Sequence, residues 1–371
     1  MKKNVSNILF SAVILLLGSA FLHDETPLLI EYAEKTFFPT MYYSINADEE
    51  NQLNDIILKK ILPLYAYMSE NTPSPTETED ILTYEMLLAQ QENDEYTMSE
   101  DIEVQVQDTQ KEQTVQTAEV SMDKLRDFNY LLSKYYTVDS TTTIGPEQLN
   151  VDDLLSRNMQ IDNKKNGPKI LIFHTHSQEG FKDSVAGDSN TSIVGMGRYL
   201  SELLNAKGIE TLHHDGVYDL INGKLDRSKA YQMSEAGVKE ILNQNPSIEV
   251  IIDLHRDGVP ETTHLVTEVN GKQTGKIMFF NGLSRTKKNG DIEYLPNPYI
   301  QDNLSFSFQM QLAAEKLYPG LTRRIYLKGY RYSLHMMPKS LLIEAGAQNN
   351  TVEEMKNSME LLANILVEVL L

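Results

Sequence analysis

The sequence predicts a three-layer α/β domain, in which a mostly parallel, twisted central sheet is flanked by helices. From about residue 167 onward, apolar runs of strand length alternate with segments of helical spacing. Such alternation is typical of a parallel sheet with helices on both faces. Three of the apolar runs, at 170–173, 250–254 and 340–343, also lead directly into ionisable residues. Ligands of open α/β sheets meet the carboxyl ends of strands, so this is where we expect the chemistry.

The remaining elements follow in chain order. Residues 125–135 and 151–155 carry short helical patterns, and Asn150 is a plausible N-cap for the second. Helices are predicted at 191–207, 228–245, 303–318 and 351–371, and further strands at 209–212 and 324–327. Segments 264–269 and 276–280 flank Asn270–Gly271, a strong turn signal, so they are expected to form a hairpin.

The first 118 residues read as three segments that lie outside this domain. Lys2 and Lys3 precede an apolar run at about 8–22, so residues 1–24 are an export signal. We expect an uncleaved single-pass membrane anchor with the rest of the chain outside the cytoplasm; a cleaved signal peptide and a buried core helix are the alternatives. Residues 25–68 have helical spacing and are expected to lie close to the membrane, or to pack elsewhere as a marginal helix. Residues 69–118 are acidic and poor in apolar side chains, which predicts a disordered spacer.

Residues 119–166 are interpreted as a leader that packs on the outside of the catalytic domain or presents substrate to it, and residues 167–371 as the catalytic domain itself. The net charge is −20, and most of it falls in the first 166 residues. Such acidity repels phosphates and makes nucleic acid an unlikely partner. The chain has no cysteine and eight histidines, so any metal must be held by imidazole and carboxylate groups.

Zinc catalysis requires three protein ligands and an open position for water, with a separate carboxylate to accept the proton. His176, Glu179 and His255 are the candidate ligands, and Glu344 is the candidate base. His174 is an alternative to His176, because both lie on one face of an extended chain. Another reading is a helix start, with Thr175 or Ser177 as the cap and Glu179 in the first turn.

The apolar run at 250–254 is less ambiguous, because strand alternation places two carboxylates on the same side as the imidazole that follows it. Asp253 or Asp257 is expected to orient His255, although a surface ion pair at the strand end is the competing reading. Glu344 follows an apolar run with no basic neighbour, so its pKa should be raised, unless it simply faces solvent. Polar residues near strand ends or loops are candidates for lining a substrate groove: Arg256, Asn281, Asn297 and Arg331.

Four stretches, FHTHSQE, DLHRDG, YRYSLHMMPKSLLIEAGAQNN and LNVDDLL, resemble the stage II sporulation protein P family. That family comprises membrane-anchored cell-wall hydrolases of endospore-forming bacteria, similar in fold to zinc-dependent N-acetylmuramoyl-L-alanine amidases. The resemblance implies that His176, Glu179 and His255 bind Zn²⁺ and that Glu344 is the catalytic carboxylate. The spacing of three between His176 and Glu179 is shorter than in the wider amidase pattern.

The same resemblance implies a substrate, partners and a place of action. The substrate would be peptidoglycan, cleaved between N-acetylmuramic acid and L-alanine and also at peptide cross-links. The partners would be stage II sporulation proteins D and M, during septal wall thinning and engulfment in the space between the septal membranes. Two other functions stay open: a metal-free glycan hydrolase that uses Glu179 and Glu344, and a wall-binding scaffold without activity.

Overall fold

The structure is a computed structural model that describes residues 121–288 and 290–371. The predicted membrane anchor, membrane-proximal segment and acidic spacer lie outside the described residues. No helix within the described ranges combines the length and the apolar character needed to cross a membrane.

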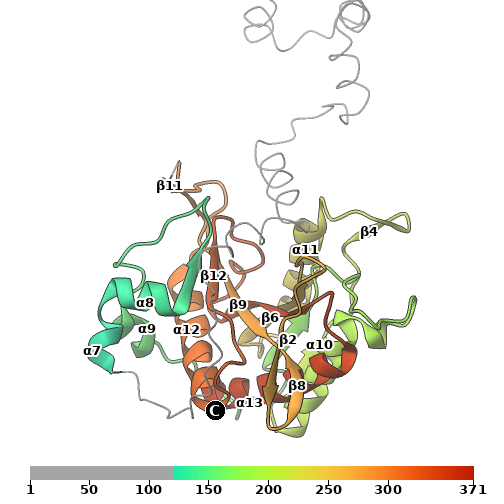
Figure 1. Cartoon of the computed structure of the whole chain (residues 1–371). Coiled ribbons are helices and arrows are strands. Elements are labelled where there is room, and N and C mark those ends of the chain that lie inside the picture. The colour runs from blue at the N-terminus through green and yellow to red at the C-terminus, as the bar shows by residue number, and fades with distance from the viewer. Residues whose placement is uncertain (1–120, 289) are drawn as a thin grey trace, which may run out of the picture. The chain divides into compact units, whose positions relative to one another are not determined.

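A seven-stranded sheet forms the centre of the domain (Figure 1). Its strand order is β1–β12–β9–β13–β6–β2–β3, and every neighbouring pair is parallel except β13 with β9. The predicted mostly parallel sheet is therefore confirmed, with one addition: two parallel groups run in opposite directions and meet at β13 and β9. In sheet order the strands are Tyr136–Val138, Ile325–Lys328, Ile277–Gly282, Ser340–Ala347, Val250–Asp257, Ile170–Phe173 and Thr211–His213.

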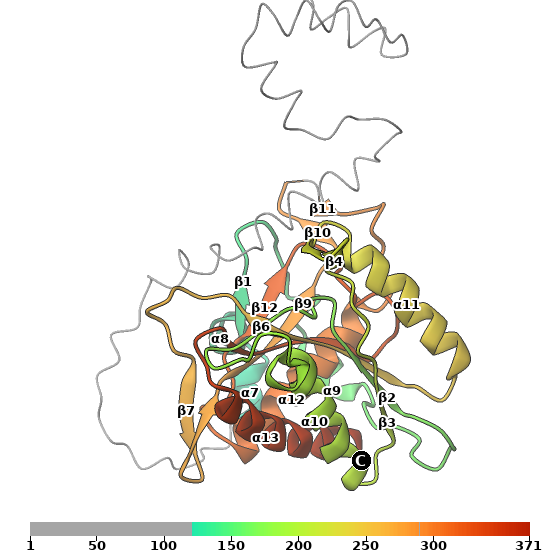
Figure 2. The same cartoon turned by 90° about the vertical axis from the view of Figure 1, so that its right-hand side faces the viewer.

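Helices cover both faces of the sheet, which gives the three layers. The helices α10 (Ile193–Ala206), α12 (Ile300–Leu317) and α13 (Val352–Leu370) bury the larger core against one face. The helix α11 (Ala230–Gln244) covers part of the other, and Figure 2 shows it well apart from that group. The α13 helix begins with a capping box, in which the Thr351 side chain and Glu354 satisfy each other's backbone N–H groups.

The leader is built into the domain rather than laid on its outside. It forms α7 (Met122–Leu125), α8 (Phe128–Tyr135), β1 and α9 (Val151–Ser156). The Asn150 side chain caps α9, as predicted, by accepting from two backbone N–H groups. β1 pairs in parallel with β12 as an edge strand, and Leu131 and Leu154 are fully buried in the main core. A three-residue strand has no alternation long enough to be recognised in the sequence.

The predicted hairpin is correct in its turn and wrong in its second arm. Asn270 and Gly271 have φ angles of 54° and 77°, as a tight hairpin turn requires. They join β7 (Val266–Val269) to β8 (Lys272–Gly275). The segment expected as the second arm belongs to β9, whose six residues are all buried, and burial on both faces marks a central strand.

Two strands extend further than the sequence predicts. β6 continues to Asp257 and β13 to Ala347, so His255 and Glu344 lie within strands and not beyond their ends. Their side chains therefore project from a face of the sheet. Two small hairpins complete the fold: β4 (Leu220–Ile221) with β5 (Lys224–Leu225), and β10 (Arg285–Thr286) with β11 (Gly290–Asp291).

Candidate metal centre

The candidate site lies on the face of the sheet that α11 partly covers. Along β6, Val250, Ile252 and Leu254 enter the large core. Strand alternation therefore turns Asp253 and His255 to the opposite face. The β13–β6 register places Glu344 directly beside His255, so the two side chains are neighbours on this face. A bulge follows Glu344 in the same strand pair, as bulges often do beside active sites.

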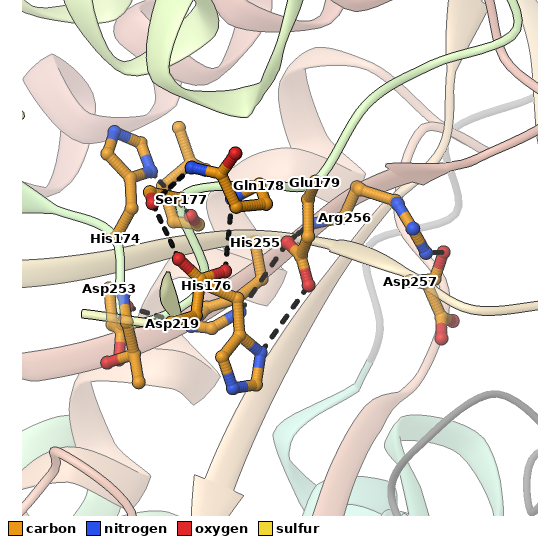
Figure 3. Close-up of polar contacts among 12 residues, drawn as sticks. His174, His176, Ser177, Gln178, Glu179, Asp219, Asp253, His255, Arg256 and Asp257 are labelled. Atoms are coloured by element: carbon orange, nitrogen blue, oxygen red, sulfur yellow. Dashed lines mark hydrogen bonds and ion pairs between the residues drawn. The ribbon is translucent and has the colours of Figure 1, made fainter. Parts of the chain in front are cut away.

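His176 and Glu179 reach this face from the loop that follows β2. Asp219, fully buried, accepts hydrogen bonds from Ser177 Oγ at 2.7 Å and from the Gln178 backbone N–H at 3.1 Å (Figure 3). These bonds hold the residues between the histidine and the glutamate in a turn. The next helical turn, η1 (Ser189–Thr191), begins ten residues after Glu179, so the interpretation of this motif as a helix start is wrong.

His176, Glu179 and His255 converge around one point (Figure 3). One ligand atom from each lies within 4.8 Å of the others. His176 Nδ1 is 3.5 Å from Glu179 Oε1, and His255 Nδ1 is 3.6 Å from Glu179 Oε2. Ligand atoms about 2.0–2.1 Å from a tetrahedral zinc ion lie about 3.3–3.4 Å apart, so these separations fit a zinc site. His176 Nε2 is buried without a hydrogen-bond partner.

Asp253 fixes the orientation and tautomer of His255. Its Oδ1 lies 2.8 Å from His255 Nε2 and also accepts the Thr175 backbone N–H at 2.9 Å. Its Oδ2 accepts the hydroxyls of Thr175 at 2.7 Å and Ser333 at 2.8 Å. An ionised carboxylate only accepts, so Nε2 carries a proton, and Nδ1, which faces Glu179, is the nitrogen that can coordinate a metal ion. Such carboxylate–histidine pairs are typical of metal sites.

The electrostatics of the group favour a cation. Burial opposes ionisation of Glu179, yet attraction to His255 and the close approach of the His176 and His255 imidazoles hold its pKa well below the usual range. Burial likewise opposes a charge on His255, but Asp253 and Glu179 raise the pKa of this imidazole well above its ordinary value. The two carboxylates stabilise a positive charge that lies between them. Either a proton on His255 or a bound metal ion can supply this charge, so the two compete for the site.

Glu344 differs from Glu179 in that few interactions compensate for the burial of its charge. Burial, together with the nearby Asp257, raises the pKa of Glu344 to about 8, and attraction to His255 offsets this only in part. Its Oε2 is buried and has no hydrogen-bond partner among the described residues. A carboxyl group whose pKa lies near neutrality is suited to accepting a proton and returning it.

His174 and Asn281 are not brought to the site. His174 Nδ1 donates to the Leu254 carbonyl at 2.8 Å, and its Nε2 lies 3.0 Å from His213 Nε2, so the ring points away from Glu179 (Figure 3). The chain leaves the extended conformation after Phe173, and the alternation that grouped His174 with His176 no longer applies. The Asn281 amide donates to Ser307 Oγ of α12 at 2.6 Å, on the opposite face of the sheet.

The other predicted residues lie around the group with different partners. Asp257 pairs with Arg323 at 2.5 Å and not with His255, so Asp253 alone orients the imidazole. The Arg256 backbone N–H donates to Glu179 Oε2 at 2.9 Å, and its Nε is buried without a partner. Arg331 pairs with Glu235 of α11 at 3.2 Å, which ties the loop before β13 to that helix.

Sequence reasoning missed several residues that build the site. Thr175, Ser333 and Asp219 hold Asp253 and the ligand loop, and Arg227 lies 3.9 Å from Glu179. Tyr231 packs edge-to-face on His176, with ring centroids 5.6 Å apart. The only local signal was the position of Thr175 between two histidines, since the other four residues lie far from the ligands in the chain.

The fold and this group define a class: an α/β domain that carries a His–Glu–His cluster and a buried carboxyl group on one face of its sheet. The model of the family "Stage II sporulation protein P (SpoIIP)" matches residues 53–367, and the chain belongs to this family. Stage II sporulation protein P of Bacillus subtilis (strain 168) is 25% identical over 246 residues, which are 60% of this chain. The match spans 58% of that relative's length.

Solved structures with some likeness include two amidases. N-acetylmuramoyl-L-alanine amidase AmiC2 of Nostoc punctiforme is 13% identical, with a TM-score of 0.32, and the match covers 55% of this chain and 98% of that one. The CwlD amidase from Clostridioides difficile, in complex with the GerS lipoprotein, is 16% identical, with a TM-score of 0.33 and coverages of 54% and 99%. Scores this low carry no conclusion about this chain.

Proposed function

We propose that the chain is a zinc-dependent peptidoglycan hydrolase that cleaves the amide between N-acetylmuramic acid and L-alanine. The observation that carries the proposal is the meeting of His176, Glu179 and His255 beside the unpartnered carboxyl group of Glu344. Metal ligands next to a carboxyl group of raised pKa are the two components that metal-assisted amide hydrolysis requires. Membership of the sporulation family supports the cell wall as the setting.

The residues of the site have separate roles in this reaction. His176, Glu179 and His255 hold the ion, and Asp253 orients His255 through their 2.8 Å contact. When bound, zinc would lower the pKa of a water molecule and polarise the scissile carbonyl. Glu344 accepts a proton from the water and delivers it to the amide nitrogen, so that the C–N bond breaks with a neutral amine as leaving group. Arg256, whose backbone N–H donates to Glu179, is the residue we propose to contact the peptide.

We extend the proposal to the biological context in the terms of the family. The catalytic domain acts outside the cytoplasm in septal wall thinning and engulfment, held to the membrane by residues 1–24. Peptide cross-links are a second possible substrate bond, and sporulation proteins D and M are the proposed partners. Each of these statements depends on the primary activity, which is tested first.

The test is digestion of purified peptidoglycan by the full-length chain, with mass spectrometry of the products and metal analysis of the protein. We expect free L-alanine amino termini and intact glycan strands from the wild type. Glu344→Gln should retain zinc and lose at least about 10²-fold in rate, because the base is removed and the ligands remain. Glu261→Gln changes an exposed carboxylate and is the matched control. An active Glu344→Gln variant would contradict the proposal.

The metal-free glycan hydrolase remains the second candidate, because the pKa of Glu344 is raised while that of Glu179 is lowered. Against it, both oxygens of Glu179 already face imidazoles, and one also accepts the Arg256 backbone N–H. Chelation separates the two. Loss of activity with a chelator, and its return with zinc, supports the amidase, whereas reducing sugar ends released in the presence of chelator would support the glycan hydrolase.

A further inference from the structure

Tyr231 lies in the first turn of α11 and packs against His176, one member of the His–Glu–His group. Three residues later on this helix, Ser234 Oγ lies 3.1 Å from Thr175 Oγ1, which in turn donates to Asp253. This contact fixes the beginning of α11 above the residues that orient His255. The Tyr231 ring meets His176 edge-to-face, at 5.6 Å and 72°.

A second aromatic contact holds the other side of the Tyr231 ring. Tyr332 packs on it at 5.4 Å and 72°, and Phe280 of β9 supports Tyr332 at 4.8 Å. Tyr332 has a φ angle of 49°, a left-handed conformation that is uncommon for a bulky residue and is found most often at functional sites. The Arg331–Glu235 ion pair ties this loop to α11 one turn beyond Tyr231. The ring is therefore clamped in one position.

The hydroxyl of Tyr231 makes no hydrogen bond to any residue in the described ranges, unlike the other donors around the site. Thr175 and Ser333 donate to Asp253, and the Arg256 backbone N–H donates to Glu179. Burial raises the pKa of Tyr231 well above its ordinary value, and the charges of Asp253, Glu344 and Glu179 act in the same direction. Of these three groups, Asp253 and Glu179 have lowered pKa values, and as ionised carboxylates they only accept hydrogen bonds.

The nearby guanidinium groups are charged donors, and each has an acidic or main-chain oxygen close to it. Arg227 lies 3.9 Å from Glu179 Oε1, and Arg256 donates to the Asp257 carbonyl at 3.2 Å. Tyr231 therefore supplies a neutral donor in a fixed position, and its hydrogen is not taken up by another group of the described residues. Hydrolysis of an amide needs such a donor, because the carbonyl oxygen gains negative charge as water adds to the carbon.

We propose that the Tyr231 hydroxyl donates a hydrogen bond to the carbonyl oxygen of the scissile amide and stabilises its charge in the transition state. This rests on the proposed function. The water oxygen bonds to the carbonyl carbon, the π electron pair moves to the carbonyl oxygen, and it returns as the C–N bond breaks. The amine nitrogen leaves with the proton that Glu344 delivers. Tyr231 keeps its own proton throughout.

The first test is the kinetics of Tyr231→Phe on peptidoglycan fragments with the full-length chain. The variant keeps the ring contacts with His176 and Tyr332 and loses only the donor. We expect kcat to fall about 10²–10³-fold, as for removal of one oxyanion donor elsewhere, with KM, zinc content and Tm unchanged. Tyr199→Phe is the matched control: it removes a phenol that bonds Glu360 at 3.2 Å on the other face of the sheet, and it should behave as wild type.

The second test uses binding in place of turnover. The probe is a muramyl-peptide analogue with a phosphinate group in place of the scissile amide, which carries its charge where the carbonyl oxygen would. Tyr231→Phe should weaken the affinity for this analogue by about 10²-fold, because transition-state analogues report the same interactions, and should leave binding of the peptide product unchanged.

The outcomes separate the two proposals. An unaltered kcat in Tyr231→Phe, when the wild type cleaves the amide, overturns the assignment of Tyr231 alone. A raised KM with normal kcat also overturns it and makes the ring a binding surface. A loss of bound zinc or a lowered Tm in Tyr231→Phe would show that the residue has a structural role instead. A wild type that leaves the amide intact overturns the proposed function, and the assignment with it.

Discussion

Asp253→Asn should separate the charge of the carboxylate from its hydrogen bonds. The amide oxygen can replace Oδ1 and accept from Thr175 N and His255 Nε2, which lie 2.9 and 2.8 Å away. The amide NH₂ then replaces Oδ2, where both neighbours are hydroxyls, of Thr175 and Ser333, that can rotate and accept. All four contacts survive, and only the negative charge beside the imidazole is lost.

The expected magnitudes follow from that change. Hydrogen bonds to a charged group contribute about 1.5–3 kcal/mol and neutral ones about 1 kcal/mol, so each of the four contacts weakens by about 0.5–2 kcal/mol. The variant no longer bears the cost of burying a charge, which offsets part of this loss in the free energy of unfolding. Loss of an outer-shell carboxylate lowers metal affinity about 10–100-fold, or about 1.4–2.7 kcal/mol. The metal effect should therefore appear in a protein that is still folded.

Two measurements on the full-length chain check this prediction. Zinc affinity is measured by competition with a chromophoric chelator, and stability by urea unfolding followed by far-UV circular dichroism. Ser333→Ala is the control, because it removes one of the four hydrogen bonds and leaves the charge; its zinc Kd should stay within about threefold of wild type. A folded Asp253→Asn variant with wild-type zinc affinity would refute the assignment of His255 as a ligand oriented by Asp253.

Three further predictions concern the surroundings of the site. Asp219→Ala removes the buried acceptor of the ligand loop, so zinc affinity should fall and the free energy of unfolding should drop by about 1–3 kcal/mol, as measured by chelator competition and urea unfolding. Gly197→Ala would place a Cβ 2.4 Å from His174 Nε2, and the overpacking should lower Tm by several degrees, at about 2–4 °C per kcal/mol. The close approach of His335 Nε2, 3.1 Å from the carboxylate, with Lys239 and Arg331, lowers the pKa of Glu235 to about 2 despite burial. This carboxylate stabilises the fold above its unfolded pKa near 4.5, and its contribution is lost as the pH falls toward 2. The stability gap between wild type and Glu235→Gln, measured by urea unfolding at several pH values, should therefore close over that range, and a gap that widens would contradict the ion pair.

Local sequence patterns predicted the fold class and most of the helices and strands. The runs at Ile170–Phe173, Val250–Leu254 and Ser340–Ile343 are long enough to show burial, and the four long helices have clear apolar spacing. The antiparallel pairing of β9 with β13 was out of reach, because strand direction in a sheet depends on contacts between residues more than 60 positions apart. The edge strand β1 is too short to show a strand pattern in the sequence.

The limits at the site have the same origin. Ionisable residues that follow buried strands pointed to residues 176, 179, 255 and 344, which the structure brings together on one face of the sheet. The choice between His174 and His176 depended on an alternation that ends with the strand. Tyr231 lies at the start of α11, and the apolar spacing of this helix explains the contacts that the helix makes with the core. That spacing does not distinguish a tyrosine that packs on His176 from one that only fills the core.

The position of β1 at the margin of the sheet bears on how the protein is to be handled in the laboratory. A fragment beginning at residue 167 would lack this strand and leave the backbone N–H and C=O groups of Ile325–Leu327 open along one side. Such an uncovered margin invites pairing between chains and aggregation. A truncation intended to isolate the α/β domain must therefore start upstream of α8, so that the sheet keeps its outermost strand.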